Sequence, residues 1–232
     1  MILQLDFILK NPELPIEYRK VIMSFLKENI KKFSQTLYDR YYNNCNKKNF
    51  TFSTQIKDIK FSKNKIETSN NSFALLLSTN DIEFGYLVYN VCLNSINSIY
   101  PLKNDNFMLL TKVTQKKETI ITNNLILCKT LSPICICDHK PHDNKSTRFI
   151  SIKNEDFSKQ IKEKYNIEIK PINCKTTIVS HQNMKFETTS GEFILCGTPN
   201  QLTNFYKSGL GSRTGEGFGM FKVIKQGEFT YQ

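Results

Sequence analysis

The sequence predicts an α+β protein built from two tandem ferredoxin-like (RRM-like) units, each with the element order β-α-β-β-α-β. Three observations predict this class. The 232 residues suit one large domain or two of roughly 100–120 residues each. Strand-like alternation and helix-like periodicity follow one another in the same order in both halves. The apolar fraction of 39%, with 17 Phe and 10 Tyr, supplies enough material for an ordinary core.

The first unit is predicted over residues 1–120. Its opening stretch, ILQLDFIL, alternates as a strand and ends before Pro12 and Pro15. Apolar residues at helical spacing then predict one long helix, and Asp81 is placed to cap a second one. The predicted strands are 2–9, 50–61, 72–79 and 107–115, and the predicted helices are 16–42 and about 82–98.

The second unit is predicted over residues 125–232, after a boundary near 119–124. LILCKTLSPICIC contains one strand or two, because Pro133 interrupts it. Asn154 is placed to cap a lysine-rich helix, and two long strands follow. The predicted strands are 125–137, 148–153, 168–180, 184–197 and 217–226, and the predicted helices are 154–165 and 198–209.

The charge of the chain indicates a polyanionic partner. Thirty-two Lys and Arg against 21 Asp and Glu give a formal net charge of +11. A surplus of this size favours nucleic acid as the partner. The alternative is compositional, because a chain rich in Lys, Asn and Ile is also typical of AT-rich genomes.

The sequence favours a cytoplasmic protein with no membrane partner. It contains no run of about 18 apolar residues, and no basic region precedes the first apolar stretch. Seven cysteines at irregular spacing suggest no disulfide framework. One cluster has the residue types that bind zinc: Cys135, Cys137, His139 and His142. It contains no CxxC pair, so a strand that carries the two cysteines is favoured over a zinc site. No metal or other cofactor is expected.

A glycine-rich stretch, GLGSRTGEGFG, holds five of the nine glycines in residues 209–219. Its spacing and its place before a strand fit neither the dinucleotide fingerprint nor the NTPase phosphate loop. A flexible turn and a backbone surface for a phosphodiester strand remain, and the latter is favoured because glycines let N–H groups approach an anion. The predicted RNA contacts here are Lys207, Gly209, Gly211, Ser212, Arg213, Gly215, Gly217 and Gly219.

These residues, extended to GLGSRTGEGFGMFKV, resemble the C-terminal loop of the RAMP superfamily of CRISPR proteins. Within that superfamily the chain is most similar to the Cas endoribonucleases that cut precursor CRISPR RNA at each repeat. Three further stretches support the resemblance and extend it over nearly the whole chain: LPIEYRKVIMSFLKENI, KKNFTFS and KTLSPICI. It implies two ferredoxin-like domains side by side, with CRISPR repeat RNA as the partner.

The resemblance also implies metal-independent cleavage. A base deprotonates the 2′-hydroxyl, the resulting oxygen attacks the phosphate, and an acid protonates the leaving 5′-oxygen, which leaves a 2′,3′-cyclic phosphate. Most members carry a histidine shortly before the motif matched here by NFTFS, but this chain has none there. Tyr42 and Lys48 match best as the catalytic pair, with Tyr38 and Tyr41 in reserve. A packing or stacking role for the tyrosines is the alternative.

Further basic residues are expected along the RNA path, among them Arg40 and Lys47. His139 and His142 are weaker catalytic candidates, because nothing places their loop beside Lys48. Two other functions stay open at this point: a protein of the same fold that holds repeat RNA without cutting it, and a structural RNA-binding protein. The sequence does not distinguish a monomer from a homodimer, or release of the product from transfer to a CRISPR effector complex.

Overall fold

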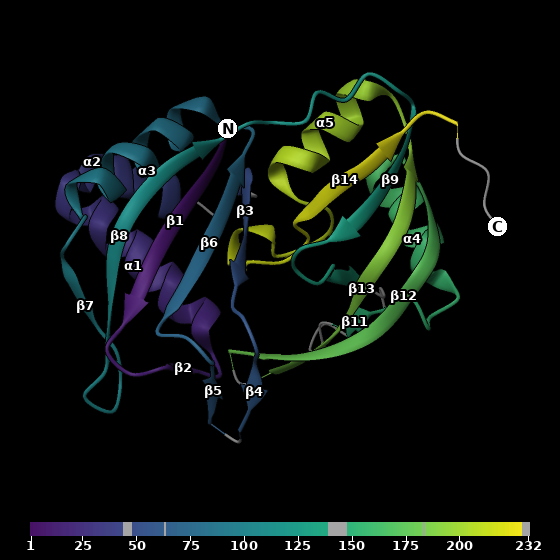
Figure 1. The fold of residues 1–232 in the computed structure, drawn as a ribbon. Coiled ribbons are helices and arrows are strands. Elements are labelled where there is room, and N and C mark those ends of the chain that lie inside the picture. The colour runs from purple at the N-terminus through teal and green to yellow at the C-terminus, as the bar shows by residue number, and fades with distance from the viewer. Residues whose placement is uncertain (44–47, 63, 139–147, 183, 229–232) are drawn as a thin grey trace.

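The computed structural model describes residues 1–43, 48–62, 64–138, 148–182 and 184–228. Two antiparallel sheets lie side by side, each with helices on one face (Figure 1). The first half of the chain forms one sheet and the second half forms the other. No helix among the described residues is long and apolar enough to cross a membrane.

The first sheet has the strand order β3-β6-β1-β8-β7. Its strands are β1 (Ile2–Leu9), β3 (Phe50–Gln55), β6 (Ser72–Thr79), β7 (Ile99–Pro101) and β8 (Phe107–Lys116). Without the edge strand β7, this is the order of a ferredoxin-like sheet, in which the first and third strands are central. Leu3, Leu5 and Phe7 alternate inward along β1 and pack beneath α1 (Tyr18–Phe33) and α3 (Ile82–Asn94).

The long helix predicted over 16–42 is two helices, α1 and α2 (Gln35–Tyr42). Ser34 is extended, with φ −161° and ψ 116°, and its hydroxyl accepts a hydrogen bond from the backbone N–H of Leu37. Ser34 therefore ends one helix and caps the next. The hydrophobic period continues through this break, which is why the pattern predicted a single helix.

The predicted strand 50–61 is also divided. After β3 the chain leaves the main sheet and forms β4 (Lys60–Phe61), which pairs with β5 (Lys65–Glu67). β5 pairs in turn with β2 (Glu13–Pro15), giving a small three-stranded sheet at one end of the molecule. This sheet forms one side of a pocket described below.

The second sheet has the order β12-β13-β9-β14, again with the first and third strands of the unit in the centre. The strands are β9 (Leu125–Thr130), β12 (Glu168–His181), β13 (Met184–Cys196) and β14 (Phe221–Gln226), and the helices are α4 (Asp156–Tyr165) and α5 (Pro199–Ser208). The tandem ferredoxin-like class is thereby confirmed. The predicted strand 125–137 is two strands, because β10 (Ile136–Asp138) pairs separately with β11 (Arg148–Ile150).

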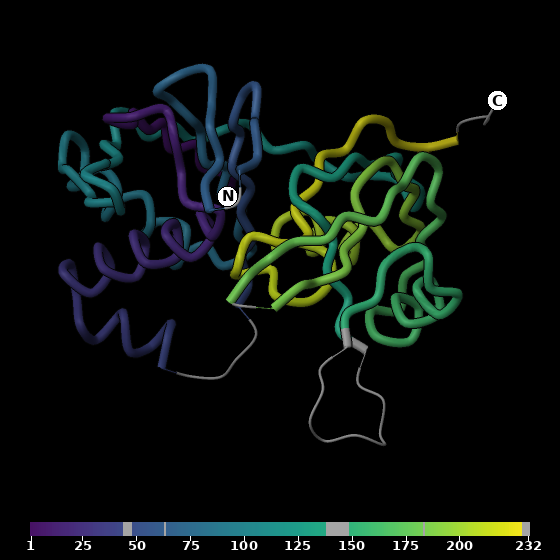
Figure 2. The backbone as a smooth tube through the Cα atoms, turned by 90° about the horizontal axis from the view of Figure 1, so that it is seen from below, coloured from purple at the N-terminus to yellow at the C-terminus, as the bar shows by residue number. Residues whose placement is uncertain are grey.

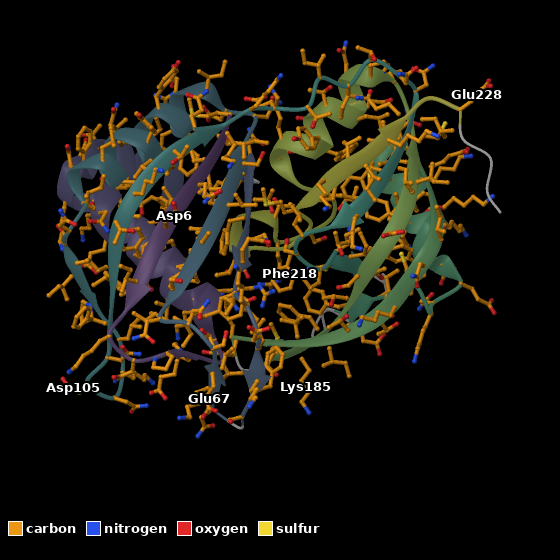
Figure 3. The ribbon with its side chains drawn as sticks, viewed as in Figure 1. Asp6, Glu67, Asp105, Lys185, Phe218 and Glu228 are labelled. Atoms are coloured by element: carbon orange, nitrogen blue, oxygen red, sulfur yellow. The ribbon has the colours of Figure 1, made fainter. Side chains whose placement is uncertain are left out.

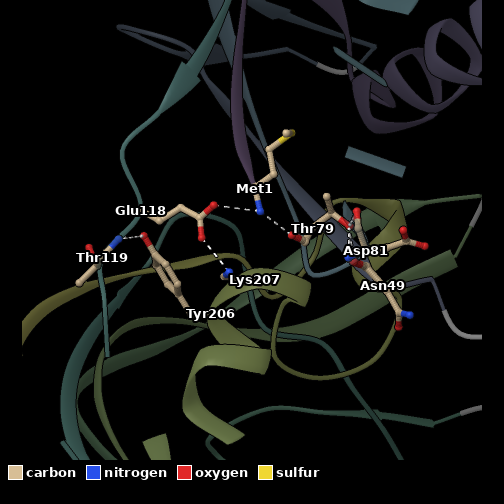
Figure 4. A network of polar contacts seen from close by, with 8 residues as sticks. All are labelled: Met1, Asn49, Thr79, Asp81, Glu118, Thr119, Tyr206 and Lys207. Carbon is tan, nitrogen blue, oxygen red and sulfur yellow. Dashed lines mark hydrogen bonds and ion pairs between the residues drawn. The ribbon is translucent and has the colours of Figure 1, made fainter. Parts of the chain in front are cut away.

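The segment between β8 and β9 carries no helix or strand, but it takes part in a polar network between the halves (Figure 4). Glu118 accepts from the Met1 amino group at 3.1 Å and from Lys207 Nζ, on α5, at 2.8 Å. The Met1 amino group also donates to the carbonyl of Thr79 at 2.8 Å. The first strand of one half and the last helix of the other are therefore tied to one carboxylate.

Candidate functional site

The glycine-rich loop lies between the two halves, and most of it is buried. It leaves α5 at Gly209, makes one turn of 3-10 helix at η1 (Thr214–Glu216), and enters β14 (Figure 2). Gly217 has φ +84°, and a Cβ there would lie 2.5 Å from the ring of Phe52. Gly219 has φ +76°, and its Cβ would meet the Leu210 carbonyl at 2.0 Å. Glycine is therefore required at both positions by backbone conformation and by space.

Hydrogen bonds fix the loop to both halves. From β3, Thr51 Oγ1 donates to the carbonyl of Phe218 at 2.7 Å. From the second half, the carbonyls of Pro133 and Cys135 accept from the N–H groups of Gly219 and Ser212, at 2.8 and 2.7 Å. The loop is thus a fitted part of the interior, and its glycines serve first to let two packed halves approach each other.

A groove of about 790 Å³ runs along the exposed side of this loop. Its walls come from α1, the end of α2, the segment just before β3, the end of α4, the β12–β13 turn and the loop itself. Five cations line it, and Glu216 is the one carboxylate in its wall among the described residues. The basic lining residues are Lys20, Lys27, Lys48, Lys164 and Arg213. Such a surface suits a polyanion.

One wall of the groove holds a cluster of three polar side chains. Glu216 accepts from Arg213 at 2.9 Å and contacts His181 Nε2 at 2.9 Å. Burial raises the pKa of the Glu216 carboxyl, but the hydrogen bonds from His181 and Arg213 outweigh it, so the pKa is lowered overall. Glu216 is therefore a stable anion that orients Arg213 in the groove wall.

The predicted catalytic pair lies in the groove. Lys48 Nζ donates to the carbonyl of Tyr41 and lies 5.3 Å from the centre of the Tyr42 ring. The Tyr42 hydroxyl is buried and has no hydrogen-bond partner in the described part of the chain. Burial raises the pKa of this phenol, and Tyr38 and Cys92 add to the shift. Tyr42 is consequently protonated at neutral pH, and its hydroxyl points away from the solvent of the groove.

The two reserve tyrosines do not line the groove. The ring of Tyr38 stacks on that of Tyr42 at 5.4 Å, and the ring of Tyr41 packs against Phe84 at 5.0 Å. Burial raises the pKa of Tyr41 as well, with nearby Asp81 adding to the shift. In this structure Tyr41 packs α2 against α3, and Tyr38 packs on Tyr42 of the same helix.

Some of the predicted RNA contacts line the groove and others do not. Gly211, Ser212, Arg213 and Gly215 line the groove, whereas Gly209 and Gly219 are buried and Gly217 borders a second pocket. Two of the predicted cations are paired elsewhere: Lys207 with Glu118, and Arg40 with Glu83 at 2.7 Å. Lys47, His139 and His142 lie outside the described residues.

Sequence reasoning missed three of the five groove cations. Lys20 and Lys27 are seven residues apart on α1, so they lie on one face of the helix, and this spacing is visible in the sequence. Lys164 lies at the end of α4, where its Nζ donates to the carbonyl of Cys137 at 2.7 Å. Nothing in the sequence signals that α4 and α1 face the same groove. Within the described ranges, no three His, Cys, Asp or Glu side chains gather as a metal-ligand set.

Two ferredoxin-like sheets with a glycine-rich loop between them, beside a basic groove, define the class of tandem ferredoxin-like α+β proteins. The particular family follows from the sequence. Residues 114–223 match the family model of the CRISPR-associated protein Cas6, C-terminal. This match confirms the resemblance of the chain to the repeat-processing RAMP proteins. A comparison with curated proteins found no match.

Several solved structures share the fold over nearly the whole chain. A Cas6-related protein from Pyrococcus furiosus superposes with a TM-score of 0.85 at 19% identity, covering 98% of this chain and 99% of that one. A RAMP protein that binds different RNA substrates gives 0.80 at 19% identity, over 97% and 100%. A Cas6 product complex gives 0.72 at 15% identity, over 96% and 99%. At these identities the likeness establishes the fold.

Proposed function

We propose that this protein binds CRISPR repeat RNA in the basic groove and cuts precursor CRISPR RNA within each repeat by a metal-independent reaction. The observation that carries the proposal is the convergence of five cations from both halves along one face of the glycine-rich loop. The Cas6 match of the second half and the fold shared with a Cas6 product complex and an RNA-binding RAMP protein support repeat RNA as the polyanion.

In the proposed reaction the 2′-oxygen forms a bond to the adjacent phosphorus, and the bond from phosphorus to the 5′-oxygen breaks. The 2′-hydroxyl gives its proton to a water molecule, and the leaving 5′-oxygen receives one. The products are a 2′,3′-cyclic phosphate and a 5′-hydroxyl. Lys48 exchanges its hydrogen bond to Tyr41 for a phosphate oxygen and stabilises the negative charge of the phosphorane.

Tyr42 is the proposed proton donor. Its raised pKa keeps the phenol protonated and unfit as a base, but an alkoxide is still basic enough to take its proton. Because the hydroxyl is buried in the free protein, the end of α2 must shift when RNA binds. We therefore expect slow cleavage compared with an enzyme that uses an exposed histidine.

The burial of the Tyr42 hydroxyl also favours a second function. If the Tyr42 hydroxyl stays buried when RNA is bound, the described part of the groove offers His181 as its only imidazole, and Glu216 already engages that ring. The protein would then hold repeat RNA through the same cations and cut it slowly or not at all.

A cleavage assay in EDTA with the CRISPR repeat RNA of the same genome tests the proposal. We expect one discrete cut with a 2′,3′-cyclic end, abolished by a single 2′-deoxy substitution at the cut site. Lys48→Ala and Tyr42→Phe should slow the cut at least tenfold. Lys159→Ala, which removes an exposed cation of α4 outside the groove, and His139→Ala should have no effect.

The outcomes separate the two functions. Tight binding with intact RNA recovered would establish the holding protein. A requirement for a divalent metal would contradict the metal-independent reaction, and equal binding of an unrelated RNA hairpin would contradict repeat recognition altogether.

A further inference from the structure

A second pocket lies on the other side of the glycine-rich loop. It has a volume of about 310 Å³ and opens between the β4–β5 hairpin of the first half and β12 of the second. Figure 3 shows Phe218 between the two sheets, with Glu67 and Lys185 toward the end where β5 and β12 approach each other. Lys20 lines the groove and the preceding residue, Arg19, lines this pocket, so the two cavities flank the first turn of α1.

Arg19 is buried there, and no described residue forms an ion pair with it. Its residue is 8% exposed, and its guanidinium lies 4.8 Å from the Tyr18 ring centre and 4.9 Å from that of Phe218. Its Nε donates to the carbonyl of Gly217 at 3.3 Å. Among the described residues no other hydrogen-bond or ion-pair partner of Arg19 is found. A buried charge with one long hydrogen bond is costly, which indicates an acceptor that the protein itself does not supply.

The pocket contains a second unmet polar group. Thr54 lines it, and the buried Oγ1 of Thr54 has no hydrogen-bond partner in the described part of the chain. The rest of the wall is mostly apolar, with Phe52, Ile66 and Leu131. A phosphate would lose its hydration against these side chains, so the ligand must be flat and largely neutral with acceptors on one edge.

An unpaired nucleobase has that chemistry. The Tyr18 and Phe218 rings accept no conventional hydrogen bond and only Nε donates within the described protein, so the terminal N–H groups of Arg19 are left for a ligand. The N7 and O6 acceptors of guanine match that edge, which is the commonest base-specific contact of arginine. At the mouth of the pocket, Phe61 is 71% exposed and Ile178 is 65% exposed, as suits a base that is unstacked from its neighbours.

We propose that this pocket is a recognition site for one unpaired guanine of the bound RNA, read by Arg19 through the N7 and O6 edge. The proposal rests on the proposed function, since the repeat RNA in the groove delivers the base. Specificity then comes from a residue distant from the cutting chemistry, while the groove lysines supply affinity that does not depend on sequence.

The test replaces each guanosine of the repeat, one at a time, by 7-deazaguanosine and measures RNA affinity. With the unmodified protein, one position should lose about tenfold in affinity, within the range of a single bidentate contact. Arg19→Met should remove this sensitivity at that position. Lys20→Met is the matched control, because it should weaken all the RNAs similarly and leave the sensitive position as it is.

Three results would overturn the inference: no sensitive position with the unmodified protein, the same sensitive position in Arg19→Met, or an equal loss of affinity for every RNA in Arg19→Met. A thermal unfolding measurement tests whether Arg19→Met still folds. Arg19→Met should unfold at a temperature no lower than the unmodified protein, because an apolar chain replaces an unpaired charge. A marked fall would show that Arg19 is structural.

A failure of the pocket proposal can be distinguished from a failure of the proposed function. If the repeat is cut but no position is sensitive, the pocket proposal fails alone. If no repeat RNA binds, the proposed function fails, and guanosine monophosphate replaces the RNA. Thermal stabilisation of the unmodified protein by this nucleotide, absent with adenosine monophosphate and in Arg19→Met, would retain the pocket. Equal stabilisation by both nucleotides would reject it.

Discussion

Tyr42 is the residue at which structure and predicted chemistry conflict most. Its ring lies in the groove beside Lys48, as a catalytic residue should, but its hydroxyl is buried and lacks a partner among the described residues. An unsatisfied buried hydroxyl costs stability. Such a cost is commonly retained where a group has a function, so Tyr42 stays the first residue to test.

We predict that Tyr42→Phe leaves the free energy of unfolding unchanged or raises it by up to about 1 kcal/mol, because it removes an unpaired hydroxyl. Urea unfolding measures this. The matched control is Tyr165→Phe, whose hydroxyl is hydrogen-bonded to Ser212 and whose loss should cost about 1 kcal/mol. A clear loss of stability in Tyr42→Phe would mean that its hydroxyl is bonded in the folded protein.

A second residue-scale prediction concerns Glu216. Its pKa is lowered in the folded protein, so its ion pairs stabilise the fold above the unfolded pKa of about 4.3, and this contribution is lost as the pH falls through the folded value. The stability difference between Glu216→Gln and the unmodified protein should therefore be largest near neutral pH, and it should shrink as the pH falls from about 4.3 through the lower pKa of the folded state.

Unfolding at a series of pH values measures this difference. Glu163→Gln on α4 is the control, since its ion pair with Lys159 is exposed and 3.9 Å long. A difference for Glu216→Gln that does not change with pH would indicate lost packing in place of lost charge.

At the scale of elements, the glycine-rich loop acts as a joint between two packed halves. Its N–H and carbonyl groups bond to β3 on one side and to residues 133–135 on the other. Residues 211–216 line the groove, and among them only Ser212, Arg213 and Glu216 are partly exposed. In the proposed RNA complex we expect these side chains to make the contacts of the loop, while most of its glycines serve packing.

We predict that Gly217→Val lowers the free energy of unfolding by about 2–5 kcal/mol, from a left-handed backbone conformation and overlap with Phe52. Gly227→Ala is the matched control. Gly227 also has a left-handed φ of +87°, but its nearest neighbour would be 3.7 Å away, so strain alone should cost about 1–2 kcal/mol. Equal losses in the two variants would mean that the contact with Phe52 relaxes freely.

At the scale of the whole molecule, the two halves each contribute cations to one groove. We propose residues 1–120 and 125–232 as the two domains, with Glu118 and the glycine-rich loop holding them in register. Each half alone carries part of the basic surface: Lys20, Lys27 and Lys48 from the first, and Lys164 and Arg213 from the second. RNA affinity should therefore depend on both halves together.

The salt dependence of RNA binding tests this arrangement. For single-stranded RNA each neutralised phosphate contributes a slope of about −0.7 in log K against log salt. Lys27→Met and Lys164→Met should each reduce the slope by about that amount, and Lys159→Met should leave it unchanged. If only the first-half variant changes the slope, the RNA does not cross between the halves.

Much of the fold was predictable because most strands and helices follow from the pattern of apolar and polar residues within one segment. The β1 and β6 strands and the α5 helix alternate or repeat at a period that reads directly from the sequence, and caps such as Asp81 and Thr198 mark helix starts. The break at Ser34 was not predictable from periodicity, because a capping serine also suits the polar face of an uninterrupted helix.

The sequence by itself determined the two ferredoxin-like units, the basic character and the glycine-rich motif, because these follow from composition and from spacings within one segment. Only the tertiary structure decided which cations share the groove, that Lys207 and Arg40 are engaged by Glu118 and Glu83, and that Arg19 is buried unpaired in the described structure. The physical reason is distance: burial and pairing are properties of residues far apart in sequence, and local patterns do not record them.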